Sequence, residues 1–266
     1  MTGSSASYAG NVHAIALQSF DRVLQLDELR AAILGRFADQ YHITYPMLSD
    51  HDSLIIRKFG ILNTNVLPGT RFYGIPFPGQ YLLEPDGTVR DRSFLPDYQT
   101  RPTASEVLLK EYGIPAADDG VTITAEDVQA RIVISDKRSF SGQRLGAAVN
   151  FKVAPGWHIY GEPLPAGYSP TSVKFDDDLV ASQALEFPQP KPVKFELLSE
   201  TLPVYQGEFR ATGYILLKQK LPPGEQKLTG TFNFQECNDR ICKLPQSVRF
   251  AISIGIDAYV PAAAKK

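Results

Sequence analysis

Apolar residues follow different periods in the two halves of the chain. In the first half, one group recurs at spacings of three or four and predicts a helix over residues 26–41: Leu26, Leu29, Ile33 and Phe37. Beyond residue 122, apolar residues alternate with polar ones in short segments separated by turns, which predicts β-strands. We therefore expect a mixed α/β half followed by an all-β half.

Local signals define further elements of the first half. Residues 42–50 have the pattern of a short buried strand, and residues 52–61 that of a short helix with an Asp/Ser cap and a stop near Gly60. The turn signal Pro85-Asp86-Gly87 lies between apolar runs and predicts a β-hairpin. A last helix is expected between Thr103 or Ser105 and Gly113. This half is assigned to residues 1–113.

Residues 114–122 combine proline, small residues and acids without periodicity, which is typical of a linker. Predicted strands follow at residues 128–135, 146–153, 171–175, 211–220, 227–237 and 246–254. Their number and turn punctuation favour an antiparallel β-sandwich over residues 123–256, with a tail at 257–266. The proline-rich stretch 186–195 is expected to be a loop or an edge segment.

Composition limits the function classes. The 266 residues are 43% hydrophobic and 21% charged, values typical of a folded protein of about two domains. The formal net charge is −2 and the basic residues are scattered, so a nucleic-acid partner is not expected. No window approaches the roughly 18–20 apolar residues of a membrane span, and the first residues lack the pattern of a signal peptide.

The candidate chemistry rests on Cys237 and Cys242, the only cysteines in the chain. The intervening Asn-Asp-Arg sequence predicts a turn that brings the two sulfurs within bonding distance. Two thiols are too few for a thiolate zinc site, and His42 and His51 lie in the other half, so neither a metal nor another cofactor is expected. The spacing of the two cysteines is compatible with three alternatives: a redox-active pair, a structural disulfide that stabilises the fold by about 2 kcal/mol, and two free thiols.

Three segments in order, PGWHIYGEP, LPVYQGEF and QECNDRICKLP, resemble the family of DsbD amino-terminal domains. The resemblance covers roughly residues 123–256 and implies an immunoglobulin-like fold whose Cys237/Cys242 pair exchanges electrons. It also implies that His158 and Tyr160 lie near the sulfurs and that Tyr205 or Phe209 provides a shielding cap. The implied partners are a membrane-embedded electron donor and thioredoxin-like proteins outside the cytoplasm.

The first half resembles the later part of AhpC/TSA-type, peroxiredoxin-like redoxin domains, a branch of the thioredoxin fold. The matching segments run from YHITYPMLSDHDSLIIRKFGILN to YQTRPTASEVL, and Pro78 matches the proline that is cis in that family. This half contains no cysteine, and its first 30 or so residues do not match the expected opening strands. We therefore expect a truncated domain without intrinsic peroxidase activity that serves in docking or as a scaffold.

The sequence thus predicts a truncated thioredoxin-like domain joined to an immunoglobulin-like exchange domain, a thiol:disulfide oxidoreductase if active. The alternatives are a non-enzymatic interaction module with a structural disulfide and a peroxiredoxin-like antioxidant protein. The resemblance implies a periplasmic or otherwise extracytoplasmic location, whereas the absence of a signal peptide favours the cytoplasm if the start is genuine.

Overall fold

The protein is described here from a computed structural model. The described residues are 34–36, 38–40, 42, 49–50, 52–70, 72–77, 79–94, 103–115, 120–195 and 200–258. The chain divides into two compact units, Met1–Arg101 and Pro102–Lys266. Among the described residues, no helix is both long and apolar enough to cross a membrane.

The first unit contains helix α2 (Leu54–Lys58), as the sequence predicted for residues 52–61. Its start differs from the expected Asp/Ser cap, because the Asp50 carboxylate accepts from the backbone N–H groups of Ile55 and Ile56. Ser53 occupies the N-cap position but donates its hydroxyl to the carbonyl of Gly74 at 2.7 Å. Residues 34–36 and 38–40 are helical, whereas Leu26, Leu29, Ile33 and Phe37 and most of segment 42–50 lie outside the described residues.

The predicted hairpin is confirmed as β1 (Gly79–Leu83) paired antiparallel with β2 (Val89–Phe94). Gly87 has a φ of 87°, a left-handed conformation that glycine adopts without steric cost. The Asp86 carboxylate accepts from the N–H of Thr88 at 2.8 Å and closes the turn locally. The Pro-Asp-Gly signal therefore specified this element through short-range contacts.

Helix α3 (Ala104–Tyr112) has the predicted caps but belongs to the second unit. Thr103 accepts from the N–H of Glu106, and Gly113 ends the helix with a φ of 71°. The helix packs on the β-sandwich because Leu109 is buried against Val133 and Ala148. The division between the units thus follows Arg101, earlier than the linker expected at residues 114–122, because burial of this helix face outweighs its position in sequence.

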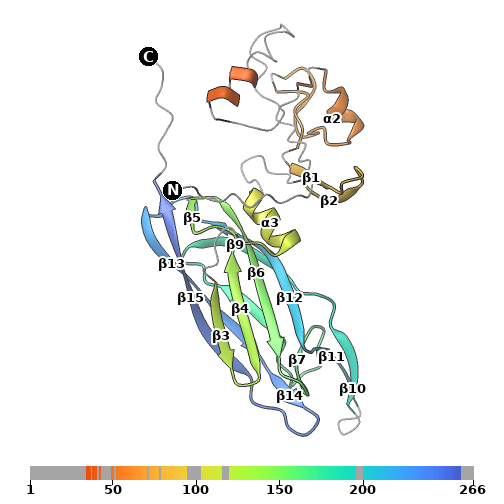
Figure 1. Ribbon diagram of the computed structural model, residues 1–266, viewed down its shortest axis with the longest axis vertical. Helices are drawn as coiled ribbons and strands as arrows, with labels where there is room; N and C mark the ends of the chain where they lie inside the picture. The colour runs from red at the N-terminus through yellow and green to blue at the C-terminus, as the bar shows by residue number, and fades with distance from the viewer. Residues whose placement is uncertain are drawn as a thin grey trace, which may run out of the picture. The chain divides into compact units, whose positions relative to one another are not determined.

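The second unit is a β-sandwich built from two large sheets (Figure 1). The first has the order β3-β4-β6-β12-β9, and the second β5-β15-β13-β8. The first sheet comprises β3 (Val121–Ala125), β4 (Val128–Ile134), β6 (Arg144–Val153), β9 (Val180–Glu186) and β12 (Glu208–Leu217). The second comprises β5 (Arg138–Phe140), β8 (Ser172–Phe175), β13 (Gly224–Phe234) and β15 (Gln246–Asp257).

The core lies between these two sheets. Side chains that face inward from both include Phe151, Ile215, Phe232 and Ile254, each at most 2% exposed. Burial of each such side chain contributes roughly 1.5–3 kcal/mol, so this layer fixes the sandwich. The predicted antiparallel sandwich is confirmed; within it, the short strand β5 is the exception and pairs parallel to β15.

A third, smaller sheet of order β10-β11-β7-β14 carries the cysteine segment. Its strands are β7 (Trp157–Tyr160), β10 (Lys191–Phe195), β11 (Glu200–Tyr205) and β14 (Glu236–Asn238). The proline-rich stretch forms edge strand β10, in agreement with one of its two expected states; Pro192 pairs with Pro203 of β11. Figure 1 shows β7 and β14 at the end of the sandwich opposite β5.

Candidate functional site

Cys237 and Cys242 form a disulfide at the edge of the third sheet. Cys237 lies in β14, opposite His158 of β7, and its backbone bridges to that of Cys242. The turn between the cysteines is closed by Asn238, whose side-chain oxygen accepts from the N–H groups of Arg240 and Ile241 at 2.8 and 2.9 Å. The Cα atoms of the two cysteines are 4.1 Å apart. The predicted turn therefore brings the pair together.

The two sulfur-bearing residues differ strongly in exposure. Cys237 is fully buried, at 0% exposed, whereas Cys242 is exposed. Two large apolar side chains beside Cys242 are also exposed, Ile241 at 54% and Leu244 at 85%. Disulfide exchange needs access to the attacked sulfur, so Cys242, the exposed residue of the pair, is the candidate for attack.

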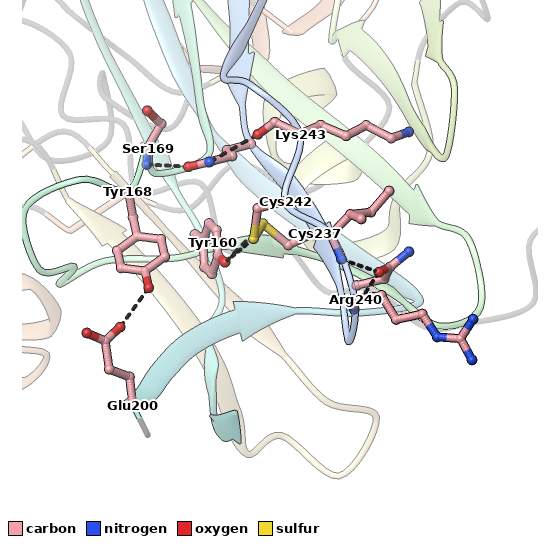
Figure 2. The surroundings of a disulfide bond; sticks show 11 residues. Tyr160, Tyr168, Ser169, Glu200, Cys237, Arg240, Cys242 and Lys243 are labelled. Atoms are coloured by element: carbon pink, nitrogen blue, oxygen red, sulfur yellow. Dashed lines mark hydrogen bonds between the residues drawn. A yellow bond between two sulfur atoms is a disulfide. The ribbon is translucent and has the colours of Figure 1, made fainter. Parts of the chain in front are cut away.

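Tyr160 of β7 is a buried side chain that contacts the disulfide with its hydroxyl. Its hydroxyl donates to Cys237 Sγ at 3.0 Å and lies 3.5 Å from Cys242 Sγ (Figure 2). The ring is fully buried, and burial, helped by Tyr168 and Glu200, raises the Tyr160 pKa to about 12. The hydroxyl therefore stays protonated at neutral pH and can donate to whichever species Cys237 forms.

Tyr168 forms the next layer around Tyr160. The two rings meet edge to face with centroids 5.1 Å apart. The Tyr168 hydroxyl points the other way, donating to Glu200 at 2.6 Å, and this hydrogen bond is the largest cause of its raised pKa (Figure 2). Glu200 begins β11, so this contact ties the segment after β7 to the small sheet.

His158 pairs with Cys237 across strands β7 and β14, so it lies near the disulfide as the resemblance implied, but in an apolar setting. It is 2% exposed, and its ring packs on Phe195 and Tyr160 at centroid distances of 4.7 and 5.4 Å. Burial lowers the His158 pKa, and the charge of Asp239 opposes that shift. Its Nε2 is buried without a hydrogen-bond partner among the described residues. The imidazole is therefore neutral at pH 7.

Tyr205 and Phe209, the expected alternatives for a cap, pack into the main core. Their rings stack with centroids 4.5 Å apart, and Phe209 also stacks on Phe151. The Tyr205 hydroxyl donates to the carbonyl of Pro188 at 2.9 Å. The aromatic side chain that is hydrogen-bonded to the disulfide is Tyr160, and a shielding role for Tyr205 or Phe209 stays a prediction. Pro78 lies outside the described residues.

A charged cluster adjoins the disulfide, and the sequence did not indicate it. Lys243, the residue after Cys242, directs its ammonium at the carboxylates of Glu126, Asp127 and Glu236. These three acids form the one group with metal-ligand spacing found in the described part of the chain, and the ammonium of Lys243 already contacts all three. Two of them are more than 100 residues from Lys243 in sequence, so no local pattern could have revealed the cluster. Tyr168 and Glu200, which are 32 residues apart in sequence, were also not singled out from the sequence.

Comparisons with known proteins agree with the two resemblances. Residues 129–254 match the family model "Thiol:disulfide interchange protein DsbD, N-terminal", and residues 23–92 match that of the AhpC/TSA family. No curated protein matches the chain.

Two solved structures are similar to part of the chain. One is the N-terminal periplasmic domain of ScsB from Proteus mirabilis, with 14% identity and a TM-score of 0.38; the match covers 51% of this chain and 49% of that chain. The other is the reduced DsbD N-terminal domain of Neisseria meningitidis, with 17% identity and a TM-score of 0.30. That match covers 53% of this chain and 90% of the Neisseria chain. This chain therefore spans about half the length of the ScsB chain. The sequence-based recognition is confirmed by the two family models: the chain combines a DsbD N-terminal-type domain at residues 129–254 with an AhpC/TSA-type region at residues 23–92.

Proposed function

We propose that the second unit exchanges electrons with dithiol and disulfide proteins through Cys237 and Cys242. The observation that carries the proposal is the asymmetry of the pair. One sulfur belongs to an exposed residue, while the other is buried and accepts a hydrogen bond from Tyr160. A disulfide that only stapled the loop would need neither an exposed cysteine nor a buried hydroxyl that donates to its partner.

The geometry supports a two-step reduction of the disulfide. A donor thiolate attacks Cys242 Sγ, the bond between the two cysteines breaks, and its electron pair leaves on Cys237 Sγ. The Tyr160 hydroxyl, 3.0 Å away, stabilises that developing thiolate by hydrogen bonding. The donor's second thiolate then attacks the donor sulfur of the mixed disulfide and releases Cys242. The donor becomes oxidised, and the pair becomes a dithiol.

Delivery of electrons runs in the opposite sense. The Cys242 thiolate attacks the disulfide of an acceptor and forms a mixed disulfide with it. Cys237 then attacks Cys242 Sγ, which restores the intramolecular bond and releases the acceptor as a dithiol. By resemblance, the donor is membrane-embedded, the acceptors are thioredoxin-like and the compartment is the periplasm; these remain parts of the proposal. Ile241 and Leu244 provide an exposed apolar border for such partners.

Single-cysteine variants test the asymmetry directly. In Cys237→Ser the remaining Cys242 thiol is exposed, whereas in Cys242→Ser the remaining Cys237 thiol is buried. We expect an aromatic disulfide reagent to react with the first variant at least tenfold faster than with the second under native conditions. Equal rates in the folded variants, with both equally fast in denaturant, would contradict the assignment of Cys242 as the attacked sulfur.

A further inference from the structure

We propose that Lys243 is a positioning residue for the redox pair. Its ammonium, held by three carboxylates, fixes the backbone that carries Cys242 beside Cys237 and so stabilises the disulfide relative to the dithiol. The inference rests on the exchange function proposed above and identifies a residue that acts on it without touching the sulfurs.

The carboxylates that contact the Lys243 ammonium belong to two different sheets. Lys243 Nζ lies 2.9 Å from Asp127 and 2.8 Å from Glu236, and it also contacts Glu126. Glu126 and Asp127 form the turn between β3 and β4 of the large sheet, whereas Glu236 immediately precedes Cys237 in β14. One side chain therefore links three points: the residue before Cys237, the residue after Cys242 and the turn of a different sheet.

The β3–β4 turn has an unusual conformation at this point. Glu126 has a φ of 47°, in the left-handed region that non-glycine residues adopt uncommonly. Glu126 and Asp127 are the two loop residues between the paired Ala125 and Val128, and two-residue hairpin loops favour a positive φ. In this tight turn the Glu126 carboxylate contacts the Lys243 ammonium.

The ion pair between Lys243 and Glu236 is the strongest of these contacts, because Glu236 is fully buried. Its side chain is 0% exposed, and Oε1 accepts from Lys243 Nζ and, at 3.3 Å, from Gln246. Oε2 is buried without a hydrogen-bond partner among the described residues. Burial of a carboxylate is costly unless a cation compensates it, so removal of Lys243 would leave Glu236 with one neutral donor.

The aromatic and backbone contacts orient the same side chain. The Lys243 ammonium lies 4.1 Å from the centroid of the Trp157 ring, within the range of a cation–π interaction. The Lys243 N–H donates to the carbonyl of Glu236 at 3.0 Å, and its carbonyl accepts from Gln235 at 3.1 Å. Lys243 is thus held at its backbone and at its tip.

This arrangement affects the redox equilibrium through geometry. When the disulfide is reduced, its covalent constraint on Cys242 disappears, but the constraint at Lys243 remains. A dithiol whose sulfurs are kept close closes more readily, because less conformational entropy is lost when the bond forms. Loss of the contacts between Lys243 and the carboxylates should therefore destabilise the disulfide relative to the dithiol and move the midpoint potential to a less negative value.

The test compares midpoint potentials of the full chain by thiol trapping in glutathione and dithiothreitol buffers at pH 6, where free thiols are protonated. For Lys243→Met we expect at least a tenfold loss in the equilibrium constant for disulfide formation, about 30 mV for a two-electron couple. Lys243→Arg retains a cation and should shift the constant by less than Lys243→Met does. Glu126→Gln combined with Asp127→Asn leaves the buried Lys243–Glu236 pair intact, so it should fold and shift the constant at least threefold in the same direction.

Arg138→Met is the matched control. Arg138 is also a cation held by two carboxylates, Asp257 and Glu225, but at β5, at the opposite end of the sandwich (Figure 1). Its removal should leave the midpoint unchanged. The inference is overturned if Arg138→Met shifts the midpoint as much as the Lys243 variants, or if the Glu126/Asp127 double variant and any folded Lys243→Met stay within twofold of wild type.

The same titration separates this inference from the proposed function. If the wild-type disulfide opens only in strongly reducing dithiothreitol buffers, the exchange function fails, yet the ratios between variants still show whether Lys243 positions Cys242. If the wild type titrates in glutathione buffers and the variants do not differ from it, the positioning role fails alone.

Discussion

At the scale of single residues, the site depends on contrasts within a small group. Cys242 is exposed and Cys237 is buried, Tyr160 donates to the buried sulfur, and His158 lies beside it without a hydrogen-bond partner for Nε2 among the described residues. In the proposed exchange, these contrasts make Cys242 the attacked sulfur, Cys237 the leaving sulfur and Tyr160 the hydrogen-bond donor. In the further inference, Lys243 holds the backbone beside Cys242 through its contacts with carboxylates such as Glu236.

Tyr160→Phe tests the donor role, because it removes the hydroxyl and keeps the buried ring. A hydrogen bond to a charged group contributes about 1.5–3 kcal/mol, so reduction of the disulfide by a small dithiol should slow by about 10- to 150-fold. Stopped-flow kinetics with dithiothreitol would measure this rate. Tyr214→Phe, in the large sheet, is the control and should react like the wild type. An unchanged rate in folded Tyr160→Phe would remove Tyr160 from the mechanism.

The buried imidazole predicts a pH dependence of stability. The His158 pKa is lowered from 6.5 in the folded state, chiefly by burial, so the unfolded chain binds the proton more readily. Stability from this residue is complete above pH 6.5 and declines as the pH falls from there toward the folded pKa. His158→Phe should reduce the loss of unfolding free energy between pH 7 and pH 5, measured by urea denaturation. An identical loss in the variant would contradict a depressed pKa at His158.

At the scale of elements, the structure shows which sequence signals were sufficient to predict a helix or a strand. The Pro85-Asp86-Gly87 hairpin and the Thr103 and Gly113 caps of α3 were predicted because each depends on contacts within a few residues. Strand β7 was not predicted as a strand, since three of its four residues are buried and no alternation remains. The Lys243 cluster joins residues from separate sheets, and only the folded chain brings them together.

The packing of α3 leads to a prediction about the sandwich. Leu109 is 1% exposed against Val133 and Ala148, so Leu109→Ala should destabilise the second unit by about 2–5 kcal/mol. Leu108 on the same helix is 42% exposed, and Leu108→Ala should cost less than about 0.5 kcal/mol. Fluorescence of Trp157, the sole tryptophan, would follow unfolding in denaturant. Similar small effects of both variants would show that α3 contributes little to the sandwich.

At the scale of the whole molecule, two regions that match different family models share one chain with one pair of cysteines. Because both cysteines lie in the second unit, the AhpC/TSA-type region has no thiol of its own. Its docking or scaffold role stays a prediction. The sequence was sufficient to recognise both regions, but it placed α3 with the first, because the packing that assigns the helix to the sandwich involves residues distant in sequence.

The absence of a thiol in the first unit predicts that the chain has no peroxidase turnover of the AhpC/TSA type. With dithiothreitol as reductant, hydrogen peroxide consumption by the wild type should equal that of Cys237→Ser/Cys242→Ser within about twofold. A colorimetric peroxide assay would measure both rates. Rapid consumption that depends on either cysteine would favour the antioxidant alternative.

The midpoint potential of the Cys237–Cys242 couple tests the central claim most directly. It is obtained by mass-resolved thiol trapping of the full chain across a series of thiol redox buffers. An exchange protein is expected to titrate reversibly between roughly −180 and −270 mV, the range of known disulfide oxidoreductases. A bond that stays closed below about −300 mV would be a structural staple, and that result would contradict the account.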